Sequence, residues 1–431
     1  ANDLAMAYLN KANALLSLGK GRAALGLYDR AIAIRERLVE REGRGELAEN
    51  LAMAYMNKAS ALRSLGEGRA ALGLFDRAIA VYERLVEREG RGELAENLAM
   101  AYMNKASALN SLGEGQAALG LFDRAIAVYE RLVEREGCGE LAENLAMAYL
   151  NKANALRILG EGRAALGLFD RAIAVYERLV EREGRSELAE NLAMAYMNKA
   201  IALLSLGEGR AALGLFDRAI VVYERLVERE GRGELAENLA MAYMNKASAL
   251  GSLGEGRAAL GLYDRAIAVY ERLVEREGRG ELADELAAAY MNKANALCSL
   301  GEGRAALGLF DRAIAIRERL VEREGRGELA DGLAKAYMNK AIALGSLGEG
   351  RAALGLFDRA IAVYERLVEQ EGRGELAENL AVAYINKAVA LGSLGEGRAA
   401  LGLCDRAIAI WERLVQQGRR ELLASLAKVK G

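Results

Sequence analysis

The sequence has no histidine and no proline, and only one tryptophan and three cysteines among its 431 residues. The lack of histidine removes the commonest general base and metal ligand. The lack of proline removes the strongest helix breaker, and the abundant alanine and leucine favour helices. The cysteines, Cys138, Cys298 and Cys404, are odd in number and fall at three phases of the repeat described below. They indicate free thiols in a reducing compartment, not a disulfide framework or a metal site.

The charges of the sequence are balanced. The 59 lysines and arginines face 61 aspartates and glutamates, for a net charge of −2. No basic stripe is present that would bind nucleic acid or an anionic membrane. No apolar run is long enough to span a membrane, and no signal peptide precedes the repeats. We therefore expect no nucleic-acid or membrane partner, no metal, no cofactor and a cytoplasmic location.

One segment recurs along the whole chain at a fixed period of 47 residues. A period of this length is typical of stacked supersecondary units. Each unit has two glycine-flanked breaks, which predict helices over about 46–65 and 69–89 in the second unit, each roughly 30 Å long. The Asn-Lys-Ala triplet that marks each unit begins at Asn10, Asn57, Asn104, Asn151, Asn198, Asn245, Asn292, Asn339 and Asn386.

The sequence thus predicts an all-α protein, an α-solenoid of nine helix-turn-helix repeats over residues 1–418. The first repeat starts inside the recurring segment, so we expect it to be truncated. Residues 418–431 read GRRELLASLAKVKG, with basic residues near the end. The expected cap covers residues 419–431. Because terminal repeats need a polar outer face, we expect a C-terminal capping helix there.

Three positions of the repeat carry further expectations. Tyr55, Ala59 and Leu62 fall on one face of the first helix, which we expect to be the core. Lys58 is expected to form an ion pair at the surface or between repeats, with a ligand-binding role as the alternative. Gly73 lies in the middle of the second helix, where glycine costs about 1 kcal/mol relative to alanine. We expect it to permit close approach of a neighbouring helix.

The spacing of these residues resembles the tetratricopeptide repeat (TPR) family over essentially the whole chain. Three features depart from the family pattern: Lys58 stands where leucine is usual, the closing proline is missing, and the unit is longer than the usual ~34 residues. The resemblance implies stacked antiparallel helix pairs in a right-handed superhelix, and it says little about function. The matching residues are Tyr55, Ala59, Leu62, Gly66, Ala71, Phe75 and Ala78.

Two columns of the first helix vary between repeats while their neighbours are kept. One column reads Asn13, Ser60, Ser107, Asn154, Ile201, Ser248, Asn295, Ile342 and Val389. The other reads Leu16, Arg63, Asn110, Arg157, Leu204, Gly251, Cys298, Gly345 and Gly392. The TPR resemblance implies that this face lines a concave groove and that its variable residues set ligand specificity. The alternative is that exposed positions tolerate neutral drift.

The asparagine that opens each triplet does not vary. An amide side chain both donates and accepts hydrogen bonds, so a row of such residues can hold the backbone of an extended peptide of any sequence. Some superhelical TPR proteins use an asparagine ladder of this kind, at the position of Asn57. The alternative is that Asn57 bonds to an adjacent helix and serves the structure.

Three classes of function follow. The first is a non-catalytic protein-interaction scaffold that binds an extended peptide or a partner helix in the groove. The alternative is a structural protein whose repeat ends associate with other copies, forming end-to-end filaments or tubes. An enzyme is the third class, and the sequence argues against it, since it shows no nucleophile–base pair and no cofactor motif.

Overall fold

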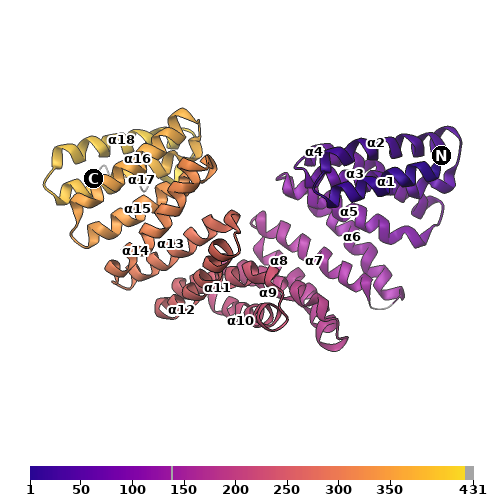
Figure 1. Ribbon diagram of the computed structural model, residues 1–431, viewed down its shortest axis with the longest axis horizontal. Helices are drawn as coiled ribbons and strands as arrows, with labels where there is room; N and C mark the ends of the chain where they lie inside the picture. Colours follow the sequence, from indigo (N-terminus) through magenta and orange to yellow (C-terminus); the bar gives the residue numbers. More distant parts are fainter. Residues whose placement is uncertain (137–138, 423–431) are drawn as a thin grey trace. The chain divides into compact units, whose positions relative to one another are not determined.

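The structure is a computed structural model that describes residues 1–136 and 139–422. This part of the chain folds into α-helices joined by short turns, without strands (Figure 1). The first half contains α1 (Asn2–Ser17), α2 (Gly21–Glu36), α3 (Ala48–Ser64), α4 (Gly68–Glu83), α5 (Ala95–Ser111), α6 (Gly115–Glu136), α7 (Glu140–Ile158), α8 (Gly162–Glu177), α9 (Ala189–Ser205) and α10 (Gly209–Glu224). The second half contains α11 (Ala236–Ser252), α12 (Gly256–Glu271), α13 (Ala283–Ser299), α14 (Gly303–Glu318), α15 (Ala330–Ser346), α16 (Gly350–Glu365), α17 (Ala377–Ser393) and α18 (Gly397–Gln416). Among the described helices, none has the length and apolar character needed to cross a membrane.

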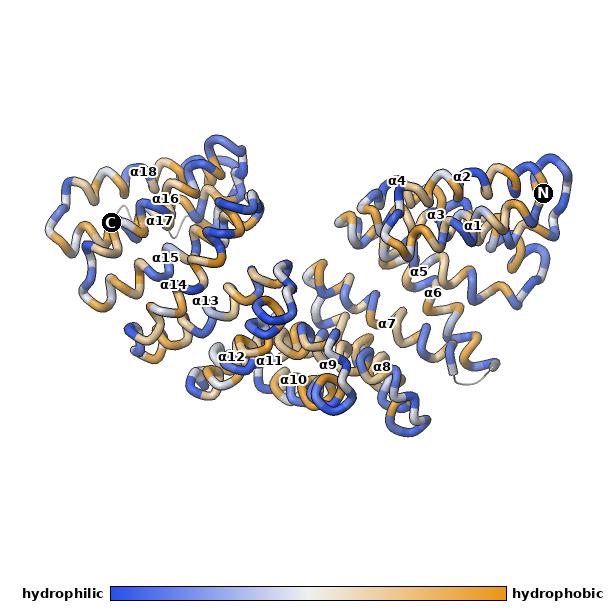
Figure 2. The backbone as a smooth tube through the Cα atoms, in the orientation of Figure 1, coloured by the Kyte–Doolittle hydropathy of each residue, from blue (hydrophilic) through white to orange (hydrophobic). Residues whose placement is uncertain are grey.

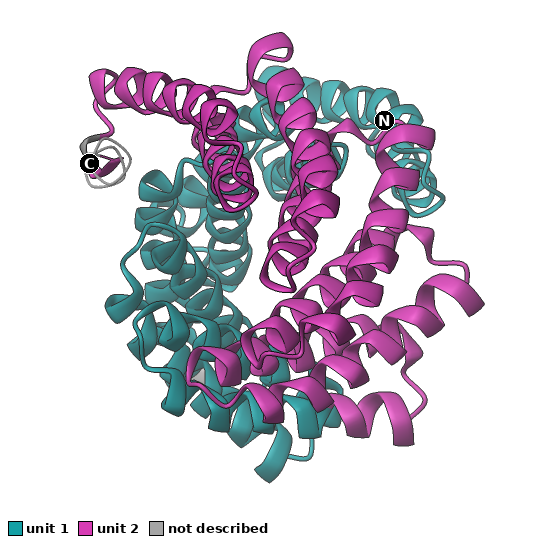
Figure 3. Ribbon diagram, turned by 90° about the vertical axis from the view of Figure 1, so that its left-hand side faces the viewer, with its two compact units in different colours: residues 1–222 teal, residues 223–431 magenta. Residues whose placement is uncertain are grey.

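The chain divides into two compact units, residues 1–222 and 223–431 (Figure 3). Within each unit, the first and second helices of a repeat pack against each other, as α3 packs against α4 and α11 packs against α12. The first helix also packs against the second helix of the preceding repeat, as α3 packs against α2. The expected all-α solenoid of helix pairs is thereby confirmed.

The turn between the two helices of a repeat depends on a left-handed glycine. Gly66 has φ +81°, a conformation that costs glycine little. Its amide donates to the carbonyl of Arg63 at 3.1 Å, and the Glu67 amide donates to the carbonyl of Leu62 at 2.9 Å. These two bonds satisfy carbonyls at the end of α3, as expected for a glycine that terminates a helix.

The second helix ends differently from the prediction of a continuous α-helix over 69–89. α4 ends at Glu83 and widens into a π-helical turn over Arg84–Arg88. The Glu89 amide closes this turn by donating to the carbonyl of Arg84 at 3.1 Å. Gly90, at φ +71°, then reverses the chain into a short 3₁₀ turn, Gly92–Leu94, that leads into α5.

The predicted core face is confirmed. Tyr55, Ala59 and Leu62 are buried, and so are Ala71 and Phe75 on the second helix. Figure 2 shows the hydropathy of the residues along the chain: the connections are largely hydrophilic, and the helices contain both hydrophobic and hydrophilic residues. Burying one large apolar side chain contributes roughly 1.5–3 kcal/mol, so stacked repeats rest mainly on this core.

A tyrosine, a glutamate and an arginine join each repeat to the next. The Tyr55 hydroxyl donates to Glu36 at 2.8 Å. Arg77 binds the same carboxylate at 2.8 Å and lies over the Tyr55 ring, 4.4 Å from its centre. The buried hydroxyl and the carboxylate therefore satisfy each other, and the cation stacks on the ring. We call this set the Tyr-Glu-Arg clamp; it recurs with Tyr102, Tyr149, Tyr196, Tyr243, Tyr290, Tyr337 and Tyr384.

Lys58 forms the expected ion pair between repeats. Its ammonium group binds Asp29 on α2 of the preceding repeat, at 2.5 Å. The Asp29 side chain is largely exposed, so the pair contributes no more than about 1 kcal/mol. The same pair recurs at Lys105, Lys152, Lys199, Lys293, Lys340 and Lys387.

The expectation for Gly73 is wrong. A Cβ atom built on Gly73 meets nothing within 4 Å, and the residue is exposed. Close approach occurs instead at the first residue of the second helix. A Cβ on Gly21 would lie 2.8 Å from a methyl group of Leu65, so the leucine of the next repeat occupies the space of a side chain.

Two expectations fall on residues that the structure does not describe. Most of the expected capping helix, from residue 423 onward, lies outside the described residues. Gly418 has φ +102° and is followed by a 3₁₀ turn over Arg420–Leu422. Cys138 also lies outside the described residues.

Candidate functional site

The first helix of each repeat carries one face that no other helix fully covers. In α3 this face contains Met53 and Ser64, which are exposed, and Asn57 and Ser60, which are half-buried. These residues follow one another at steps of four, three and four, so they share a side of the helix. We call the equivalent face in all repeats the first-helix face.

A row of methionines forms the apolar part of this face. Met53, Met100, Met147, Met194 and Met241 keep 39–44% of their surface exposed. Methionine is flexible and polarisable, which suits a surface that adapts to different apolar side chains. The later repeats depart from this row, with Ala288, Lys335 and Val382 at the same position.

The asparagine column lies beside the methionines. Asn10 is exposed, and its equivalents Asn57, Asn104, Asn151, Asn198, Asn245, Asn292, Asn339 and Asn386 are half-buried. Asn339 donates to Asn295 at 3.2 Å. Within residues 1–136 and 139–422, the other eight side chains form no hydrogen bond with the protein. The bond to an adjacent helix that a purely structural role would require is thus present at Asn339 and missing at the other eight positions, all within the described residues.

The two variable columns lie on the same face and are exposed to different degrees. Ser60, Ser107, Asn154 and Ile201 are half-buried, whereas Asn13, Ser248, Asn295, Ile342 and Val389 are exposed. In the other column Arg63, Gly251, Gly345 and Gly392 are exposed, and Leu16, Asn110, Arg157, Leu204 and Cys298 are half-buried. The exposure of these two columns agrees with a role in ligand specificity and equally with neutral drift.

Two polar groups on α7 lie buried without a partner. They are the amide oxygen of Asn154 and the Nε atom of Arg157, one helical turn apart on the first-helix face. A buried acceptor or donor left without a hydrogen bond costs about 1–3 kcal/mol.

The first-helix face carries little charge. Between the Met53 and Ser64 positions of the repeats, its charged residues are Arg63, Arg157 and Lys335. Lys335 pairs with Asp331 at 2.8 Å. The face therefore suits a largely neutral segment, in a chain whose charged residues make up 28% of the total.

The variable residues line a hollow in unit 2, between α11 and α13. Its volume is about 360 Å³. Ser248 and Gly251 come from one repeat, and Asn292 and Asn295 come from the next. Tyr263, on α12, also lines it. The structure thus brings together four residues of the columns that the sequence singled out.

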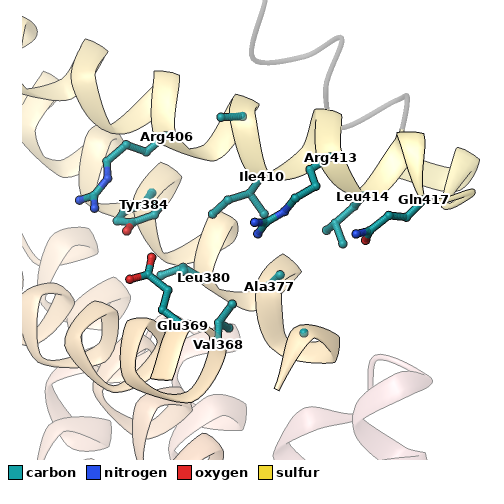
Figure 4. A pocket seen from close by; sticks show the side chains of 12 residues that line it. Val368, Glu369, Ala377, Leu380, Tyr384, Arg406, Ile410, Arg413, Leu414 and Gln417 are labelled. Atoms are coloured by element: carbon teal, nitrogen blue, oxygen red, sulfur yellow. The ribbon is translucent and has the colours of Figure 1, made fainter. Parts of the chain in front are cut away.

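A larger hollow, about 650 Å³, lies between α17, α18 and the end of the second helix of the preceding repeat (Figure 4). Leu380, Tyr384 and Ile410 contribute to its lining. The hydroxyl of Tyr384 and the guanidinium of Arg406 both bind Glu365. Smaller hollows of the same kind adjoin Tyr102 and Tyr290. They are spaces around the Tyr-Glu-Arg clamp, away from the first-helix face.

One feature of the face escaped sequence reasoning. Tyr28 and Tyr263 replace the phenylalanine that most repeats carry on the second helix. The Tyr28 hydroxyl donates to Asn13 at 2.5 Å, and the Tyr263 hydroxyl lies 3.2 Å from the Ser248 hydroxyl. The sequence signal for this feature is the exchange of phenylalanine for tyrosine at these two positions. The exchange adds a hydroxyl beneath a variable residue.

Comparison with known proteins agrees with this architecture. The family model described as tetratricopeptide repeat matches nine segments: residues 4–43, 51–90, 98–136, 145–184, 192–231, 239–278, 286–325, 333–372 and 380–418. None of the curated proteins compared with the chain matches it.

Several solved structures are similar to the chain at low sequence identity. A signal-transduction ATPase with numerous domains from Pyrococcus horikoshii, which has a tetratricopeptide repeat sensor, is 14% identical with a TM-score of 0.52. The alignment covers 93% of this chain and 55% of that chain. BtubC from P. vanneervenii is 22% identical with a TM-score of 0.45, over 59% of this chain and 92% of that chain. A Rap protein complexed with competence and sporulation factor is 17% identical with a TM-score of 0.45, over 97% and 100%.

Proposed function

The chain belongs to the tetratricopeptide repeat family, and we propose that it is a non-catalytic scaffold that binds an extended peptide along the first-helix face. The asparagine column carries this proposal. Eight of its amides have no hydrogen-bond partner within the described residues, although they are half-buried or, at Asn10, exposed. An extended peptide offers a backbone N–H and a C=O at each residue, and one amide side chain can bind both.

The neighbouring residues support a peptide over a partner helix. A helix satisfies its own backbone groups and would bind through apolar contacts, leaving the amides without partners. The methionine row gives an apolar strip beside the amides, and the variable columns would select among peptide side chains. Neutral drift of those columns remains the competing explanation, and affinity measurements decide between the two.

The proposal predicts a large loss of peptide affinity when the column is truncated. Replacing Asn104, Asn151 and Asn198 by alanine should weaken binding about 100-fold, because each amide bond to the backbone contributes about 1 kcal/mol. A peptide selected from a random library against the whole chain, then labelled with a fluorophore, gives the dissociation constant by fluorescence anisotropy.

The matched control replaces Arg88, Arg182 and Arg229 by alanine. These residues are exposed in the π-helical turns that follow the second helices, and they belong to none of the columns of the first-helix face. The control should bind the peptide as the wild type does, and both variants should keep their helical circular dichroism. Equal affinity of the asparagine variant and the control would refute the proposed role of the column.

The alternative function, end-to-end assembly, is tested on the same samples. Sedimentation velocity across a wide concentration range should show a single species if the first-helix face is the functional surface. Large species that grow with concentration would favour assembly through the repeat ends.

A further inference from the structure

The hollow between α11 and α13 differs from the rest of the first-helix face because two residue exchanges meet there. Gly251 occupies a position where earlier repeats carry a side chain, such as Arg157 or Leu204. A Cβ atom on Gly251 would meet nothing within 4 Å. Tyr263 replaces phenylalanine on the neighbouring second helix and is buried, with 5% of its surface exposed. The glycine opens the space, and the tyrosine places a hydroxyl at its inner end.

The lining of the hollow restricts the chemistry of an occupant. Its polar side chains carry the hydroxyls of Ser248, Tyr263 and Ser299 and the amides of Asn292 and Asn295, and the Ser299 hydroxyl donates to the backbone carbonyl of Asn295 at 3.0 Å. None of the residues that line it is charged, so a charged side chain entering it would lose water without gaining a counter-ion. Ala296 and Leu300 add apolar surface. The hollow therefore suits a neutral group with an apolar body and a polar end.

The two hydroxyls can still bind a third group. The oxygens of Ser248 and Tyr263 are 3.2 Å apart, longer than the ~2.7–2.8 Å that is usual between hydroxyls. Each hydroxyl can donate one hydrogen bond and accept others. A ligand hydroxyl placed between them would give both hydroxyls a further hydrogen-bond partner. Since water occupies roughly 30 Å³ per molecule, a volume of about 360 Å³ leaves ample room for an aromatic side chain.

We propose that this hollow receives the side chain of a tyrosine in the bound peptide. The ring lies over Gly251 and packs against Ala296 and Leu300, and its hydroxyl bonds to Ser248 and Tyr263. Asn292 belongs to both the asparagine column and the hollow, so it links the peptide backbone to this subsite. The inference rests on the proposed function, because it assumes that a peptide follows the first-helix face.

The chain supplies its own test variants. Gly251→Leu fills the hollow with the residue that Leu204 provides in the preceding repeat, and Tyr263→Phe restores the residue that Phe216 provides there. Gly261→Leu is the matched control, since it makes the same exchange at an exposed glycine of the second helix α12 that does not line the hollow. Because other repeats already carry the residues introduced at positions 251 and 263, and a Cβ atom meets no neighbour at position 261, the variants should fold, which circular dichroism would check.

The probes are synthetic peptides of about ten residues, with alanine and serine around one central tyrosine, phenylalanine or leucine. Isothermal titration or anisotropy against the full chain should show the tyrosine peptide binding about tenfold more tightly than the phenylalanine peptide. A site that hydrogen-bonds a hydroxyl discriminates against the analogue that lacks it. Tyr263→Phe should reduce this preference to about twofold, and Gly251→Leu should weaken the tyrosine peptide about tenfold. Gly261→Leu should change neither value.

The outcomes separate this inference from the proposed function. Equal affinity for the tyrosine and phenylalanine peptides, or an unchanged affinity of Gly251→Leu, overturns the tyrosine subsite. If the peptides still lose affinity in the asparagine variant, the proposed function stands without the subsite. If no peptide binds the wild-type chain, both are contradicted.

Discussion

Raising the pH above about 10 should unfold this protein in a cooperative step. Burial, and then the nearby charge of Glu49, raise the pKa of Tyr82 to about 12. Burial likewise raises the pKa of Tyr270 to about 12, with Glu285 and Glu237 adding to the shift. Tyr290 reaches about 12 through burial and its hydrogen bond to Glu271. Buried tyrosines therefore hold their protons far above the ordinary value of about 10.

The direction of the effect follows from proton binding. Between pH 10 and 12 a tyrosine in the unfolded chain has lost its proton, whereas the folded one keeps it. The stabilisation is complete below pH 10 and is lost as the pH rises toward 12. A shift of two units corresponds to about 2.7 kcal/mol for each group once the pH reaches 12. Because such tyrosines recur from repeat to repeat, and the stability of an array is roughly a sum over its repeats and their interfaces, the loss recurs along the array.

The measurement pairs tyrosinate absorbance with far-ultraviolet circular dichroism during an alkaline titration. We expect the tyrosines to lose their protons at the same pH at which the helical circular-dichroism signal is lost. The double variant Tyr82→Phe with Tyr270→Phe should unfold at a higher pH by a few tenths of a unit. An unchanged midpoint would show that these two tyrosines do not set the transition, and tyrosines that titrate near 10 with helices intact would contradict the expectation.

Replacing Asp284 by alanine should destabilise unit 2 by about 3 kcal/mol, because it leaves a buried arginine without its counter-ion. Arg317 has 8% of its surface exposed and stands where most repeats carry a tyrosine. Its Nε atom donates to Asp284 at 2.8 Å, and another nitrogen donates to the carbonyl of Gly332 at 2.9 Å. A Cβ atom on Gly332 would lie 3.2 Å from the guanidinium carbon, so the glycine makes room for it.

Denaturant unfolding and hydrogen exchange of the α13–α15 amides would measure this loss. The control is the double variant Arg317→Tyr with Asp284→Ala, which removes the buried charge and restores the residue found at Tyr270. It should recover most of the stability. If both variants were equally unstable, the loss would come from the aspartate alone and not from an unpaired arginine.

The sequence predicted those parts of the fold that depend on local pattern. The glycines at Gly66 and Gly90 ended the helices as expected, and helical spacing identified the buried face around Tyr55. The prediction for Lys58 was also correct, because a long cation at a repeat surface usually finds an acid in the adjacent unit. Each of these follows from residues within one repeat.

Features that need several specific side chains from different helices to meet were not predictable. The Tyr-Glu-Arg clamp joins Tyr55 to Glu36 and Arg77, which lie in three different helices. The role of Gly73 was predicted wrongly, because a glycine inside a helix does not by itself show that a neighbouring helix lies close to it. The hollow at Gly251 needs a missing side chain and the Tyr263 hydroxyl in adjacent helices, and its volume appears only in three dimensions.

Methionine oxidation footprinting tests the central claim most directly. The exposed methionines Met100, Met147 and Met194 lie on the first-helix face. Met291 on α13 and Met338 on α15 are buried. Dilute peroxide with and without a bound peptide, followed by mass spectrometry, gives an oxidation rate for each residue. The account predicts that the peptide slows oxidation of the exposed row about fivefold or more and leaves the slow, buried methionines unchanged. A peptide that binds with full occupancy, yet leaves the exposed row as reactive as before, would contradict the claim that this face is the binding surface.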